Sequence, residues 1–209
     1  MLLPESATFF LGILKDRYAV DAEQSPANQL QALVESLSKI PQQLVLDSGV
    51  KLIGFKDLGP SREYYPNHGL YVRNTLYLNT TLVDDEQVFS DRSGRILSRF
   101  DHTLYHELGH GWDERHGMLS EQQPWLELSG WSKEPLPGLS RVTISEPGTP
   151  TRVGEWFFSP TAVFPRFYAK TNPWDDWADC FAFYVAGLSE FLPASKIRYF
   201  DSALGRYWG

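Results

Sequence analysis

The sequence holds a single cysteine, Cys180, and this scarcity excludes any disulfide within the chain. Disulfide-free chains occur in several compartments, so the cysteine count leaves the location of the protein open. No run of apolar residues is long enough to span a bilayer. The apolar N-terminus lacks a basic start and is interrupted by Pro4 and Glu5. We therefore expect folded structure there rather than a signal peptide.

Basic residues are also in short supply. The 26 Asp and Glu residues outnumber the 19 Lys and Arg residues, which gives a net charge of −7. Nucleic acids and anionic membrane surfaces both require basic patches, so neither is expected as a partner. Hydrophobic residues make up 42% of the 209 residues, which is enough to build a real core. We expect one domain spanning residues 1–209.

The pattern along the chain predicts an α+β fold. Proline and glycine recur between residues 118 and 160, where we expect an irregular insertion whose aromatic residues wall or cover a cleft. Strands are expected at residues 50–55 and 70–78, the second as a hairpin that turns at Asn74. Apolar residues at helical spacing predict helices at residues 28–40, 42–46, 96–116, 175–188 and 194–204.

The most informative motif lies in the helix predicted at residues 96–116. Residues 106–110 read His-Glu-Leu-Gly-His, an HExxH motif. Because His106 and His110 are four residues apart, their side chains lie on one helix face and can bind the same Zn²⁺. Glu107 projects toward the same metal and can act as general base on a zinc-bound water. His102 lies one turn earlier, and we expect a structural role for it.

Catalytic zinc usually takes three protein ligands, so a third must lie elsewhere. His116 would give the spacing of a metzincin, but Asp113 stands where that motif has glycine. Met118 is also not placed to form the methionine turn that metzincins need. The other source is the later helix, where Asp175 and Asp179 are four apart and share a face.

The later segment carries a family resemblance. Tyr168 is followed seven residues on by Asp175, and then by the run Trp-Ala-Asp-Cys-Phe at residues 177–181. Together with the HExxH motif, this resembles the gluzincin metallopeptidases, in particular the catalytic domain of anthrax lethal factor and the Pro-Pro endopeptidases. The resemblance implies a zincin-like fold with His106, His110 and Asp175 on zinc. It also implies Tyr168 as a donor to the oxyanion and Asp179 as an acceptor for a ligand histidine.

The chain departs from the family at two positions, because Asp175 and Asp179 stand where the family has glutamates. Aspartate is shorter by about 1.5 Å, so Asp179 or Asp176 remains an alternative third ligand unless the helices pack closely. Asp113 has three open roles, namely support of the site, capping of the helix end, or pairing with Arg115. Cys180 is expected to be a small buried side chain rather than a thiolate ligand.

Together these features predict a zinc-dependent endopeptidase of the zincin type, with Glu107 and Tyr168 as catalytic residues. A protein or peptide substrate would bind by strand addition along the edge near residues 70–78. The rival interpretation is a zincin-fold binding or structural component of a larger assembly, such as a phage particle or toxin complex. The two glutamate-to-aspartate changes favour that rival.

Overall fold

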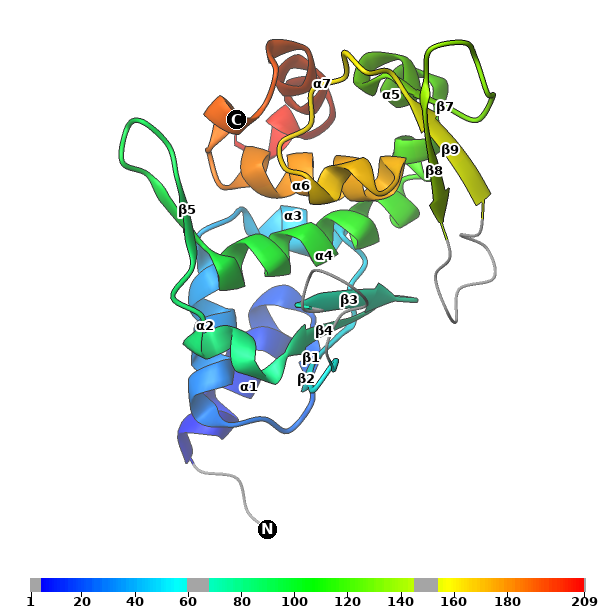
Figure 1. Ribbon diagram of the computed structural model, residues 1–209. Helices are drawn as coiled ribbons and strands as arrows, with labels where there is room; N and C mark the ends of the chain where they lie inside the picture. Colours follow the sequence, from blue (N-terminus) through cyan, green and yellow to red (C-terminus); the bar gives the residue numbers. More distant parts are fainter. Residues whose placement is uncertain (1–4, 60–67, 145–153, 209) are drawn as a thin grey trace.

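The computed structural model describes residues 5–59, 68–144 and 154–208, which form a mixed α+β arrangement (Figure 1). Among these residues, no helix has both the length and the apolar character needed to cross a membrane. The predicted helices near residues 28, 42 and 194 are present at close to their expected bounds. The helices are α1 (Glu5–Tyr18), α2 (Ala27–Ser38), α3 (Gln42–Asp47), α4 (Arg99–Arg115), α5 (Gln123–Ser129), α6 (Pro173–Val185) and α7 (Ala194–Leu204).

The main sheet has four strands in the order β1-β2-β4-β3. The first three in this order run parallel, and β3 runs antiparallel to β4 at the edge. Arg73 and Asn74 link β3 to β4 with φ values of 48° and 65°, the geometry of a tight type I′ hairpin. The predicted hairpin at Asn74 is therefore confirmed. The strands are β1 (Asp21–Ala22), β2 (Leu52–Lys56), β3 (Gly69–Val72) and β4 (Thr75–Asn79).

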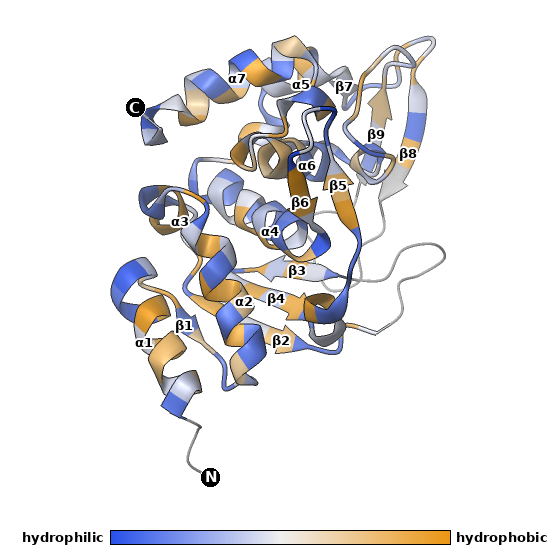
Figure 2. Ribbon diagram, turned by 90° about the vertical axis from the view of Figure 1, so that its left-hand side faces the viewer, coloured by the Kyte–Doolittle hydropathy of each residue, from blue (hydrophilic) through white to orange (hydrophobic). Residues whose placement is uncertain are grey.

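Helix α4, which carries the HExxH motif, lies between the main sheet and α6 (Figure 1). Figure 2 shows the same stacking from the side, with the mainly apolar strands β2 and β4 beneath the helix. Every residue from Phe100 to Asp113 is buried. The motif therefore lies inside the protein, which excludes a chance occurrence of HExxH on an exposed surface helix.

Helix α4 begins at Arg99 rather than at Ile96, as the sequence had predicted. Residues Ile96–Ser98 form strand β6, which pairs with β5 (Val88–Ser90). The Ser98 hydroxyl accepts a hydrogen bond of 3.0 Å from the amide of Asp101. A serine at this position caps the first turn, so the helix starts directly after it. At the other end, Gly117 has a φ of 88° and closes the helix as predicted.

The predicted insertion contains regular structure. After α5 come three short strands, β7 (Trp131–Ser132), β8 (Ser140–Ile144) and β9 (Gly154–Phe158), which form a sheet in the order β7-β9-β8. Figure 1 places this sheet beside the first turn of α6.

The aromatic residues of this segment do not wall a cleft. Trp131 and Trp156 are buried together with Leu126 and Trp174 in a second hydrophobic core, and Trp125 lies in the main core. The prediction is wrong because these side chains bury one another, which periodicity alone does not reveal. Since Trp174 lies in the first turn of α6, the second core instead anchors the turn that carries Asp175, the candidate ligand.

Candidate metal centre

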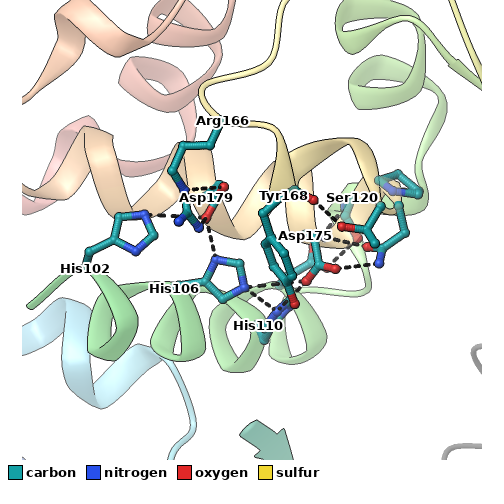
Figure 3. A network of polar contacts seen from close by, with 12 residues as sticks. His102, His106, His110, Ser120, Arg166, Tyr168, Asp175 and Asp179 are labelled. Atoms are coloured by element: carbon teal, nitrogen blue, oxygen red, sulfur yellow. Dashed lines mark hydrogen bonds and ion pairs between the residues drawn. The ribbon is translucent and has the colours of Figure 1, made fainter. Parts of the chain in front are cut away.

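Two helices bring the predicted ligands together. Helix α4 carries His106 and His110 one turn apart, and α6 carries Asp175 in its first turn. All three side chains are buried, and one potential ligand atom from each lies within 4.8 Å of the others. Figure 3 shows the three side chains converging on one point between the helices.

The spacing of the donor atoms fits a tetrahedral metal ion. The Nε2 atoms of His106 and His110 are 3.0 Å apart, and Oδ1 of Asp175 lies 3.5 Å from the first and 3.3 Å from the second. A tetrahedral ion with bonds of about 2.0–2.1 Å holds its ligand atoms about 3.3 Å from one another. Two imidazole nitrogens and one carboxylate oxygen are also donors typical of catalytic zinc sites with a fourth position open.

Close helix packing compensates for the short side chain of Asp175. A Cβ atom placed on Gly109 would lie 3.1 Å from the ring of Phe181 and 3.3 Å from the Cα of Ala178. Helix separation depends on the size of the side chains at the contact, and here a glycine faces an alanine. Helix α6 therefore approaches α4 closely, which removes the need for a glutamate.

Asn172 orients the carboxylate of Asp175. It is the N-cap of α6, and its Oδ1 accepts a hydrogen bond of 2.6 Å from the backbone amide of Asp175. Its Nδ2 donates to Oδ2 of the same aspartate at 2.6 Å. The capping interaction that starts the helix thus holds one carboxylate oxygen and leaves the other directed at the histidines.

Asp179 lies one turn after Asp175 and supports His106 from the side. Its Oδ1 is 2.9 Å from Nδ1 of His106, the contact that the family resemblance implied. Arg166 donates to both oxygens of Asp179, from Nε at 2.9 Å and from Nη2 at 2.5 Å (Figure 3). His102 also approaches this carboxylate, at 3.4 Å from Nε2. Asp179 is therefore occupied by other partners and lies outside the ligand cluster.

These contacts set the protonation of the metal-free site. Burial alone would lower the pKa of His106, but its hydrogen bonds to Asp175 and Asp179 outweigh burial and raise the pKa to about 10. Burial would raise the pKa of both aspartates, yet the histidines at Asp175 and Arg166 at Asp179 lower each pKa well below its usual range. Metal binding to His106 must therefore displace a proton.

Glu107 is buried and lies against strand β3. A Cβ atom placed on Gly69 would fall 2.5 Å from Oε1 of Glu107, 2.7 Å from its Cγ and 2.8 Å from Cγ2 of Thr103. Only a glycine at this point of the edge strand leaves room for the glutamate where it lies. No motif in the sequence pointed to Gly69, because its importance comes from a contact between distant segments.

Tyr168 lies at the start of a short 3-10 turn (Tyr168–Lys170) just before α6. The centroids of its ring and that of His106 are 5.8 Å apart. Figure 3 shows the ring reaching from this turn toward His110. Both residues predicted to be catalytic, Glu107 and Tyr168, therefore lie beside the ligand cluster, and their roles stay predictions.

Two other candidates, at the C-terminal end of α4, lie outside the ligand cluster. The ring of His116 stacks on Trp112 with centroids 3.6 Å apart, and its Nδ1 donates to the carbonyl oxygen of Trp112 at 2.7 Å. It is not part of the ligand cluster, so the metzincin alternative finds no support. Asp113 accepts hydrogen bonds from the amide and the hydroxyl of Ser120, at 2.9 Å and 2.5 Å. It thus ties down the chain after the helix.

Asp176 and Cys180 face the opposite side of α6. Both oxygens of Asp176 accept from the buried Lys196 of α7, at 2.6 Å and 2.8 Å, and one also accepts from Trp131 at 3.2 Å. The alternative of Asp176 as a ligand is therefore wrong. Cys180 is buried as predicted, and burial raises the pKa of its thiol, which disfavours a thiolate.

A scan against models of known protein families finds none that matches this chain. A search of curated proteins finds no similar sequence either. The function is therefore inferred from the residues and their geometry.

Proposed function

We propose that the protein is a zinc-dependent endopeptidase with a zincin-like fold. The observation that carries the proposal is the arrangement of His106, His110 and Asp175 at tetrahedral spacing, with the carboxylate of Glu107 on the adjacent residue. The arrangement of the secondary structure also supports it. The edge strand β3 lies on one side of the HExxH helix, and α6, with the proposed third ligand, lies on the other.

In the proposed reaction each residue of the site has a separate role. A bound Zn²⁺ would supply a Lewis acid and a water whose pKa is lowered toward neutrality. Glu107 accepts the proton of the attacking water and then gives it to the leaving amine. The hydroxyl of Tyr168 donates a hydrogen bond to the developing oxyanion, a contact worth about 3 kcal/mol in comparable sites. Asp179 holds His106 in the tautomer that presents Nε2.

Strand β3 is the proposed platform for the substrate. It is the last strand of the main sheet and, among the described strands, none pairs with its outer side. An extended peptide can therefore add to this edge through main-chain hydrogen bonds. The close approach of Gly69 on this strand to Glu107, the proposed general base, supports this platform.

The test combines metal analysis with peptide cleavage. The purified protein should contain about one zinc per chain, as a tetrahedral three-ligand site implies, and cleave members of a peptide library until a chelator is added. Glu107→Gln should keep the metal and lose about 10²–10⁴-fold in rate. Glu114→Gln is the matched control, because Glu114 is an exposed carboxylate on the same helix and should leave the rate unchanged.

Cleavage by Glu107→Gln at the wild-type rate would refute the mechanism. A metal-loaded protein that cleaves no peptide would refute the endopeptidase itself and favour a binding or structural role.

A further inference from the structure

A second charged group lies on the same helix as the two candidate histidine ligands. Arg99 is the first residue of α4, seven residues before His106, and therefore lies two turns away on nearly the same face. Thr103 lies between them and is close to Gly69 of the edge strand. Arg99 is thus aligned with the candidate metal ligands along one side of α4.

Among the described residues, the side chains within hydrogen-bond distance of the Arg99 guanidinium are neutral. Its Nη2 donates to Oε1 of Gln87, and its Nη1 lies 3.4 Å from Nε2 of His68. Its Nε is buried and, within the described part of the chain, has no hydrogen-bond partner. No ion pair joins Arg99 to a described carboxylate, and Asp85 and Asp179 act on it only from a distance.

Arg166 increases the positive charge near Arg99. The guanidinium carbons of Arg99 and Arg166 lie 5.5 Å and 5.4 Å from the ring centroid of Phe89. Arg166 forms an ion pair with Asp179, whereas Arg99 interacts with that carboxylate only from a distance. Burial, and then Arg166, lowers the pKa of Arg99. A half-buried charge of this kind is stabilised when an anion binds next to it.

We propose that Arg99, with His68 and Arg166 beside it, forms a subsite that binds a carboxylate of the substrate. This rests on the proposed endopeptidase function and adds a substrate class to it. The carboxylate has two sources, an acidic side chain within a longer peptide or the free C-terminus of a short one. The chemistry of recognition is the same for both.

The geometry also fixes where the carboxylate lies along the substrate. Seven residues of helix advance about 10 Å, which matches about three residues of extended peptide. Strand β3 runs beside α4 in the same direction: Gly69 approaches Glu107, and further along both elements Tyr71 approaches Gly111. A peptide antiparallel to β3 therefore reaches Arg99 with residues after the cleaved bond, at about the third position.

The test uses matched peptides that differ at the third position after the cleaved bond. One pair carries Glu or Gln there, and a second pair ends at that position with a free carboxylate or an amide. The wild type should favour the carboxylate by about tenfold in kcat/KM in at least one pair, and the pair that responds identifies the source. Arg99→Gln should reduce the ratio to about one, and Arg99→Lys should keep part of it.

Arg92→Gln is the matched control. It removes the same charge from an exposed arginine on the β5–β6 hairpin and should leave the ratio unchanged. If Arg99→Gln does not fold, the salt dependence of the wild-type ratio replaces it. That ratio should fall several-fold between about 0.05 M and 0.5 M salt, because a partly exposed ion pair is screened.

Direct binding of the same peptides to metal-loaded Glu107→Gln separates this proposal from the endopeptidase function. Tighter binding of the carboxylate peptides that depends on Arg99 supports the subsite even if no peptide is cleaved. Equal treatment of both members of each pair, in cleavage and in binding, would overturn it. A ratio that survives Arg99→Gln, or does not respond to salt, would overturn it as well.

Discussion

Gly69 offers the sharpest test of how the fold positions the general base. In Gly69→Ala the new methyl carbon would lie 2.5 Å from Oε1 of Glu107 and 2.7 Å from its Cγ. Ordinary van der Waals contact needs about 3.5 Å, so the Glu107 side chain must move by about 1 Å. The crowding falls on side-chain atoms that can rotate away, and the substitution should therefore displace the base without unfolding the protein.

The structure allows the magnitude to be estimated. A displacement of about 1 Å in a catalytic group costs on the order of 10²-fold in rate, or about 2.7 kcal/mol of activation free energy. The free energy of unfolding should rise slightly or stay unchanged, since alanine is favoured over glycine within a strand by roughly 0.5–1 kcal/mol. Metal affinity should be retained, because Glu107 is not among the proposed ligands.

The assay is kcat and KM on one cleaved peptide, with zinc content and melting temperature measured on the same samples. Gly12→Ala is the matched control, because a Cβ atom at Gly12 meets nothing within 4 Å. A lowered kcat with metal and melting temperature preserved would agree with a displaced base. A kcat within about twofold of the wild type would refute the reasoning, since Glu107 would then tolerate the displacement or not act as the base.

Three further predictions concern the supports of the site. Gly109→Ala should push α6 away and weaken zinc affinity about tenfold or more in a chelator competition, and adding Asp175→Glu should recover part of the loss; an unchanged affinity would contradict the packing argument. Lys196→Met leaves Asp176 buried without its cation and should cost about 3–5 kcal/mol in urea unfolding, whereas a cost under about 1 kcal/mol would count against a buried pair. His106 has a folded pKa raised from 6.5 to about 10, so its contribution to the stability of the chelated protein is complete below pH 6.5 and is lost as the pH rises toward 10. The melting temperature of the chelated protein should therefore fall over that range, and zinc-loaded protein should lack this fall because the metal replaces the proton.

Features with local causes were predicted well. The turn at Asn74 depends on residue types that act within a few positions, and it lies where the sequence placed it. Helix α6 starts two residues before the predicted Asp175, directly after its N-cap Asn172. The start of α4 was predicted too early because Ile96 belongs to a strand that pairs with β5 in a hairpin, and helical spacing does not reveal this pairing. The tryptophans of the insertion were assigned to a cleft because only the folded chain shows that they bury one another.

The same distinction between local and tertiary causes applies to the candidate site. The shared face of His106 and His110 follows from helical spacing alone. Arg166 carried no local signal, because it acts on Asp179 from a loop. The reach of Asp175 was equally hidden, since it depends on how closely α6 approaches α4 at Gly109.

The choice between Asp175 and Asp179 shows why spacing alone leaves the ligand open. Both carboxylates lie on one face of α6, and each contacts His106, but at different nitrogens. Arg166 holds Asp179 at the Nδ1 side, so that carboxylate has no free approach to His110. Asp175 lies at the Nε2 side and is also 3.3 Å from Nε2 of His110. Only Asp175 can therefore complete a three-ligand centre with both histidines, while Asp179 fixes the ring between them.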